Sequence, residues 1–141
     1  LSVLRSLSLR VKVILPIHPR TKKVIEKYSI STEGLHIIDP VSYLIMIALL
    51  TNARIVITDS GGLQKESYFA KVPCITLRDE TEWIETLENG WNRLVSPNDC
   101  NTIRSTAEML LQVDFTNKIY LESYGTGEAS TKILDILINH S

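Results

Sequence analysis

Short runs of apolar, mostly β-branched residues alternate along the chain with longer segments in which apolar residues recur every three or four positions. The first pattern predicts buried strands and the second predicts amphipathic helices. The predicted strands cover residues 11–15, 34–39, 53–58, 72–77 and 92–95. The predicted helices cover residues 20–28, 41–51, 62–70 and 81–88, and two more lie around 103–111 and 133–137. Near-continuous apolar strands that alternate with helices are typical of a parallel sheet covered on both faces, so we expect an α/β, Rossmann-like lobe.

The two ends of the chain carry weaker patterns. The chain opens with LSVLRSLSLR rather than with methionine, and Leu1, Leu4 and Leu7 are spaced as on one face of an amphipathic helix. We therefore expect a fragment, or a chain that begins partway through a larger protein. Residues 117–127 have two glycines and few apolar anchors. This segment is predicted to link the lobe to a C-terminal helix that packs elsewhere on the protein.

Composition narrows the classes of function. The length of 141 residues suits a single domain, and the net charge of −1 gives no general basic field, so we expect no nucleic-acid partner. The longest apolar run, residues 43–50, is too short to cross a membrane, which predicts a water-soluble, cytoplasmic protein. Cys74 and Cys100 are interpreted as reduced, packed thiols, with a single disulfide as the alternative. Histidines and cysteines show no metal-ligand spacing, and we expect neither a metal nor a cofactor.

The stretch TDSGGLQKES, residues 58–67, is the first candidate for chemistry. Ser60, Gly61 and Gly62 follow the third predicted strand and open the next predicted helix. In an open parallel sheet, ligands bind beyond the carboxyl ends of the strands. Paired glycines let backbone N–H groups approach a ligand, and a helix N-terminus adds unpaired donors and about half a positive charge. With the Ser60 hydroxyl as a further donor, this turn is suited to a phosphate.

Glu66 lies one helical turn beyond Gly62. A carboxylate at that position can accept hydrogen bonds from two sugar hydroxyls, as in ribose recognition, so the spacing fits a nucleotide. The same residues also fit an ordinary strand-to-helix connection, in which the helix dipole alone favours an early glutamate. The stretch is neither a Walker A loop nor a GxGxxG turn. Both interpretations stay open on these residues alone.

Two other predicted strands are followed by candidate side chains. His18 and Arg20 come after the first strand, and Arg78 comes after the fourth, so all three face the carboxyl edge of the sheet. Each has two interpretations. It can line a ligand cleft, or it can support a loop, in the case of Arg78 through an ion pair with Glu82.

Several stretches together resemble the non-hydrolysing UDP-N-acetylglucosamine 2-epimerases. These are TDSGGLQKES, VPCITLRDETEWIE and ENGWNRLV, together with HPRT, IIDPVSYL and SYGTGEASTKILDIL. They span nearly all of the chain in the order of the family. Two stretches depart from its usual pattern. Trp83 and Ile84 stand where many bacterial members have Arg-Pro, which resembles a branch that includes epimerases of modified sugars. Thr126 stands between two glycines where the family usually has aspartate.

The resemblance implies one lobe of the two-lobed GT-B architecture, with UDP bound between the lobes. All of residues 1–141 would form the C-terminal, UDP-binding lobe. By matching position, Ser60, Gly61 and Gly62 would hold the diphosphate and Glu66 the uridine ribose. The loop from Val41 to Met46 would lie against the uracil.

Family members invert C2 of the sugar through elimination of UDP and its re-addition. Their acid/base carboxylates sit on the N-terminal lobe, and a histidine motif lies upstream of the matched region. The family interconverts UDP-GlcNAc and UDP-ManNAc. We therefore expect this chain to bind a UDP-sugar but not to epimerise it alone.

Three alternatives remain at this stage. The lobe could serve a modified UDP-sugar such as UDP-diacetamido-glucuronate, could be a non-catalytic nucleotide-sugar-binding remnant, or could be the donor lobe of a GT-B glycosyltransferase. Family members often pair, so a homodimer is a further possibility, while no contact with a membrane is expected. The region upstream of Leu1 would separate these classes, because each predicts a different first lobe.

Overall fold

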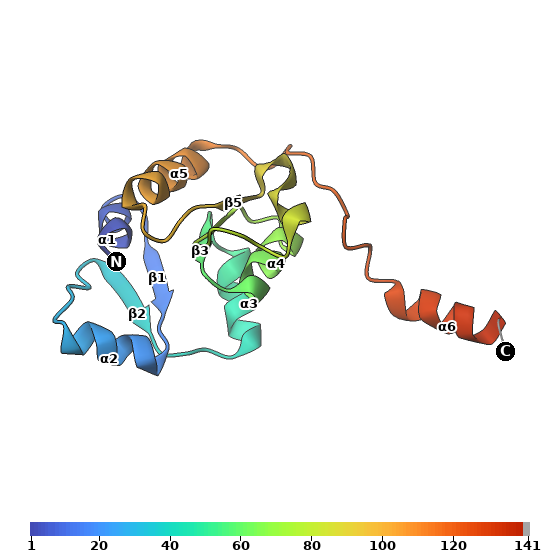
Figure 1. Ribbon diagram of the computed structural model, residues 1–141, viewed down its shortest axis with the longest axis horizontal. Helices are drawn as coiled ribbons and strands as arrows, with labels where there is room; N and C mark the ends of the chain where they lie inside the picture. The colour runs from blue at the N-terminus through green and yellow to red at the C-terminus, as the bar shows by residue number, and fades with distance from the viewer. Residues whose placement is uncertain (140–141) are drawn as a thin grey trace.

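Five short parallel strands, six α-helices and one 3₁₀ helix make up residues 1–139, the part of the chain that the computed structural model describes (Figure 1). The strands are β1 (Val13–Pro16), β2 (Leu35–Ile38), β3 (Val56–Thr58), β4 (Cys74–Thr76) and β5 (Asn92–Leu94). The α-helices are α1 (Ser2–Ser8), α2 (Pro19–Lys27), α3 (Tyr43–Thr51), α4 (Gly61–Phe69), α5 (Cys100–Gln112) and α6 (Ala129–Asn139). The 3₁₀ helix η1 covers Ile84–Gly90.

The strands form two parallel sheets rather than the single sheet that the pattern predicted. One sheet pairs β1 with β2, and the other has the order β3-β4-β5. Val13 of β1 and Ile57 of β3 nevertheless pack against the same core cluster. The two sheets therefore share one hydrophobic layer.

Helices cover both faces of the three-stranded sheet, as predicted for an α/β lobe. Ile75, at the centre of β4, packs with α1 and α5 through residues such as Leu7 and Ala107. Its neighbour Thr76 points to the opposite face, where its hydroxyl donates to Gln64 of α4 at 3.4 Å. This alternation along β4 follows from the two-residue period of a strand. It places an apolar core on one face and polar side chains on the face of α4.

The helix predicted over residues 81–88 is the clearest difference in local structure. The chain instead forms the 3₁₀ helix η1, which is interrupted at Glu88 and Asn89. Asn89 has φ 54° and Gly90 has φ 67°. Both values lie in the left-handed region, which asparagine and glycine tolerate best. The Asn-Gly pair therefore ends the helix and turns the chain into β5.

The segment before α6 is anchored more firmly than predicted. The Tyr68 hydroxyl donates to the carbonyl of Leu121 at 2.6 Å, and the indole Nε1 of Trp91 donates to the carbonyl of Ile119 at 2.8 Å. The Tyr120 ring lies between those of Tyr68 and Trp91, with ring centroids 4.8 Å and 6.0 Å away. Beyond Tyr120 the chain leads to α6, which lies apart from the other helices and strands and has no buried residue (Figure 1).

The two cysteines are free and lie in opposite environments, which excludes the disulfide alternative. Cys74 is 1% exposed on β4, and burial raises the pKa of its thiol to about 12. Cys100 begins α5 and is exposed, so the expectation that both thiols are packed is wrong for this residue. A thiol reacts through its thiolate, which makes Cys74 the inert member of the pair.

We expect a thiol reagent such as iodoacetamide at pH 8 to modify Cys100 rapidly and Cys74 only after unfolding. Intact-mass spectrometry over time checks this, with Cys100→Ser as the matched control that should show no fast modification. Rapid double labelling of the folded chain would contradict the buried position of β4.

Candidate functional site

The junction between β3 and α4 forms the mouth of a helix at the carboxyl edge of the sheet. Ser60 is the N-cap of α4, and its Oγ accepts the backbone N–H of Leu63 at 3.3 Å. The backbone N–H of Ser60 itself donates to Thr58 Oγ1 at 3.1 Å. Because Ser60 Oγ accepts at this cap, its hydrogen can be donated to a ligand. We call this region, Ser60 to Gly62, the glycine mouth.

The two glycines of the mouth meet different surroundings. A Cβ added to Gly61 would lie 2.7 Å from Glu82 Oε1 and 3.6 Å from Arg78 Nη1. A Cβ added to Gly62 would meet only Ser60 Oγ, at 3.9 Å. A side chain at Gly61 would therefore meet the tip of Glu82, whereas Gly62 leaves open space. The sequence pattern gave no means of separating these two roles.

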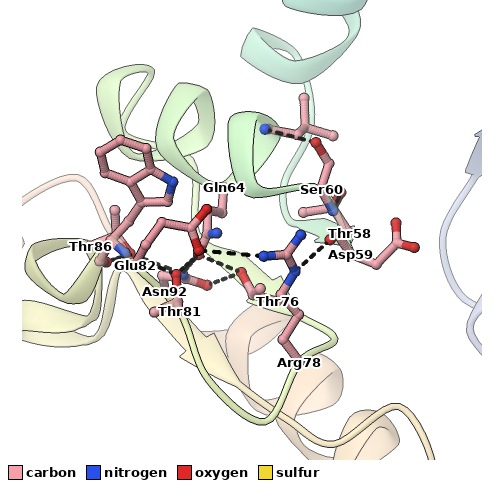
Figure 2. A network of polar contacts seen from close by, with 12 residues as sticks. Thr58, Asp59, Ser60, Gln64, Thr76, Arg78, Thr81, Glu82, Thr86 and Asn92 are labelled. Carbon is pink, nitrogen blue, oxygen red and sulfur yellow. Dashed lines mark hydrogen bonds and ion pairs between the residues drawn. The ribbon is translucent and has the colours of Figure 1, made fainter.

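Arg78 is held directly at the glycine mouth (Figure 2). Its Nε donates to the carbonyl of Asp59 at 2.8 Å, and its Nη1 forms an ion pair with Glu82 Oε2 at 3.4 Å. The internal ion pair considered from the sequence is present. Both side chains are partly exposed, so the pair contributes at most about 1 kcal/mol to stability. The backbone contact, rather than the ion pair, fixes where the guanidinium lies.

A buried polar network lies directly beneath the mouth and was not foreseen from the sequence. The Oε1 atom of Gln64 accepts from Thr81 Oγ1 at 2.9 Å and from Asn92 Nδ2 at 3.1 Å. Asn92 also accepts from Thr76 at 2.8 Å and donates to Thr86 at 3.0 Å. Figure 2 shows these side chains converging from α4, β4, β5 and η1. A signal was available, because Thr76 and Asn92 are polar residues within predicted buried strands.

The network sets the position of the loop that follows β4. Thr81 lies between Arg78 and Glu82, and its hydroxyl also accepts the backbone N–H of Trp83 at 3.1 Å. The loop is thereby fastened to Gln64, one turn into α4. Since Gln64 is fully buried, its hydrogen bonds are shielded from water. They hold the loop after β4 against α4.

A second contact joins α4 to the same loop and to the C-terminal segment. The ammonium of Lys65 lies over the rings of Trp83 and Tyr124, 4.0 Å and 4.9 Å from their centroids. The Tyr124 hydroxyl donates to Glu85 Oε2 at 2.9 Å. Burial, followed by the hydrogen bond to Glu85, raises the pKa of Tyr124 above its ordinary value. Cation–π contacts of this kind hold the first turns of α4 against η1.

The remaining predicted residues lie on neighbouring elements. Glu66 is half-buried on α4, and α3 packs against α4. Val41 precedes α3 and Met46 lies within it, both half-buried. His18 lies after β1, in the loop beside the two-stranded sheet. It is the N-cap of α2, and its Nδ1 accepts the backbone N–H of Arg20 at 3.2 Å. The supporting role considered for His18 is therefore present.

Two depressions lie at opposite ends of the three-stranded sheet. One, of about 720 Å³, is lined by the loop after β4, from Arg78 to Glu82, and by Pro97. The other, of about 420 Å³, includes Ala53, Pro73 and Trp91, which precede β3, β4 and β5. Ligands of parallel sheets bind at the carboxyl ends of the strands, which favours the depression beside Arg78.

Residues 1–139 contain neither a metal-ligand cluster nor a membrane-spanning helix. No group of three or more histidine, cysteine, aspartate or glutamate side chains there could hold a metal ion. Within the same range, no helix has both the length and the apolar character needed to span a bilayer.

Comparison with known proteins assigns the chain to a family. The family described as UDP-N-acetylglucosamine 2-epimerase matches residues 1–138. The chain belongs to this family. The resemblance noted in the sequence is thereby confirmed at the level of the family, and the glycine mouth can be considered in that context.

Relatives with related activities match over most of the chain. A UDP-N-acetylglucosamine 2-epimerase homologue from Methanococcus maripaludis is 44% identical over 133 residues, which are 91% of this chain and 36% of that protein. The UDP-2,3-diacetamido-2,3-dideoxy-D-glucuronate 2-epimerase of Pseudomonas aeruginosa is 43% identical over 128 residues, covering 89% of this chain and 34% of that protein. The chain thus spans about a third of the length of the curated relatives it matches.

A solved structure supports the fold. The UDP-GlcNAc 2-epimerase of Methanocaldococcus jannaschii, in complex with UDP-GlcNAc and UDP, superposes with a TM-score of 0.79 and 36% identity. The match covers 98% of this chain and 38% of that structure. The chain therefore has the fold of one lobe of the GT-B epimerases, as the sequence predicted.

Replacing Gln64 by leucine tests the buried network. The change removes an acceptor and leaves the donors of Thr81 and Asn92 buried without it, so we expect a loss of about 2–4 kcal/mol in the free energy of unfolding. Urea denaturation measures this loss. Gln112→Leu at the exposed end of α5 is the control, with an expected change within about 0.5 kcal/mol. Equal effects of the two substitutions would refute the network as a stabilising unit.

Proposed function

We propose that this chain is the UDP-binding lobe of a UDP-N-acetylglucosamine 2-epimerase. In this proposal the whole enzyme interconverts UDP-GlcNAc and UDP-ManNAc by inversion at C2, through elimination of UDP and its re-addition. The observation that carries the proposal is the glycine mouth with the Arg78 guanidinium beside it, in a chain that belongs to this epimerase family.

The diphosphate would bind at the N-terminus of α4. The N–H groups of Gly61 and Gly62 fall in the first turn, where a helix supplies no carbonyl partner. Their partial positive charge attracts an anion, and the hydroxyl of Ser60 and the guanidinium of Arg78 add further donors. Hydrogen bonds from a guanidinium to a phosphate are charge-assisted and therefore stronger than neutral ones. These groups can together neutralise much of a diphosphate's charge.

The nucleoside would extend from the mouth along α4 and α3. Glu66, one turn further along α4, would accept hydrogen bonds from the two ribose hydroxyls. Val41 and Met46 would offer an apolar surface to the uracil, since α3 packs against α4. His18 remains a predicted site residue. Its Nδ1 is engaged in capping α2, so only its Nε2 is available to a ligand.

The sugar and the activity of the isolated chain are further parts of the proposal. The 43% identity to a UDP-2,3-diacetamido-2,3-dideoxy-D-glucuronate 2-epimerase supports a modified UDP-sugar as the second candidate substrate. Both candidates share UDP, so both require the same mouth. The family's acid/base carboxylates lie on the other lobe, and we propose that residues 1–141 alone bind UDP without epimerising its sugar.

We expect calorimetric titration of UDP into the chain to show binding that Glu66→Ala weakens about 10-fold or more, because the ribose loses a charged hydrogen-bond acceptor. Glu26→Ala, which removes an exposed carboxylate from α2, is the matched control and should leave the affinity unchanged. At about 100 times its dissociation constant, UDP should also raise the free energy of unfolding by roughly 2.7 kcal/mol.

Three results would count against the proposal. Absence of UDP binding by the folded chain would refute the proposed nucleotide site. Equal affinity of the Glu66→Ala variant and the unchanged chain would remove Glu66 from the ribose position. Turnover of UDP-GlcNAc by the purified chain would contradict the assignment of chemistry to the other lobe.

A further inference from the structure

A carboxylate of the protein occupies the region in front of the glycine mouth. Glu82 Oε1 lies 2.7 Å from the position that a Cβ on Gly61 would take, so its negative charge is next to the first residue of α4. The other oxygen, Oε2, pairs with Arg78 Nη1 at 3.4 Å. Figure 2 shows the carboxylate of Glu82 and the guanidinium of Arg78 facing each other below α4. A helix N-terminus and an arginine thus already face an anion.

This arrangement opposes a bound diphosphate in two ways. The carboxylate and a phosphate would both be attracted to the same partial positive charge, and at short range they repel each other. The ion pair also uses part of the guanidinium that would otherwise face the phosphate. A ligand anion therefore has to displace Glu82 before it can make full contact with the mouth and with Arg78.

The displacement requires only a side-chain movement. The Glu82 side chain is 55% exposed, and its single ion pair is long and partly solvated, so little free energy holds it in place. Arg78 keeps its hydrogen bond to the carbonyl of Asp59, which does not involve Glu82. Thr81 remains fastened to Gln64, so the loop itself does not need to move.

We propose that Glu82 is a built-in competitor for the diphosphate site, and that ligand binding exchanges its carboxylate for phosphate at the Arg78 guanidinium. The inference rests on the proposed function, since it assumes a diphosphate ligand at this mouth. Glu82 then sets the affinity of the site and favours release of the product nucleotide. Its negative charge also disfavours weakly held small anions when no nucleotide is bound.

Titration of UDP into the unchanged chain, Glu82→Gln and Glu88→Gln tests the exchange. Glutamine has nearly the same size as glutamate and keeps a hydrogen-bond acceptor for Arg78, but it carries no charge. We expect Glu82→Gln to bind UDP about 3- to 30-fold more tightly, since the competing charge is gone. Glu88→Gln removes the same charge from an exposed position of η1 that does not line the depression beside Arg78, and its affinity should stay within about twofold of the unchanged chain.

The outcomes separate this inference from the proposed function. Measurable binding by the unchanged chain that becomes tighter in Glu82→Gln alone supports the exchange. Binding by the unchanged chain that is equal or weaker in Glu82→Gln overturns the competitor role and leaves the UDP site intact. Equal gains in UDP affinity in both variants would mean that the effect comes from the change in net charge, and this result also overturns the competitor role of Glu82. No UDP binding by any of the three folded proteins overturns the proposed function and the inference together.

Discussion

The hydrogen bonds accepted by the buried amide oxygen of Gln64 are the constraint on which the site depends. Through Thr81 and Asn92, this one atom joins the first turns of α4 to the loop after β4 and to β5. Neither strand pairing nor apolar packing specifies where that loop lies relative to the helix. Because these hydrogen bonds are buried, breaking them would leave polar groups with neither a protein partner nor water. Other positions of the loop would therefore be higher in free energy. Glu82, which follows Thr81 directly, is held near the glycine mouth in this way, and Arg78 is held there by its hydrogen bond to the carbonyl of Asp59.

The charges around the mouth have a balanced arrangement. The helix N-terminus and Arg78 supply positive potential, and Glu82 offsets part of it at short range. The Lys65 ammonium lies over the rings of Trp83 and Tyr124. The polar network and the aromatic contacts of Lys65 thus hold the same loop from two sides. An anion site built in this way can be rigid in its backbone and still exchange one side chain for a ligand.

The fold class, most element positions and the family followed from the sequence, for definable physical reasons. Apolar periodicity identifies strands and helices because each element buries one set of positions, and it placed α4 and β4 within a residue or two. Periodicity is insensitive to pairing between distant polar side chains, so the contacts of Gln64 with Asn92 were missed. The split into two sheets and the anchoring of Tyr120 also depend on tertiary contacts. The approach of Glu82 to Gly61 is of the same kind, since only the folded loop brings a carboxylate to the glycine mouth.

We propose that the chain holds its ligand at the carboxyl edge of the three-stranded sheet, where α4 begins. Two-dimensional ¹H–¹⁵N NMR during titration with UDP tests this most directly. We expect the largest shifts on the backbone amides of Gly61, Gly62 and Leu63 and on the Nε–H of Arg78. Shifts concentrated instead on residues of the depression at the opposite edge, such as Ala53 and Lys118, would contradict it.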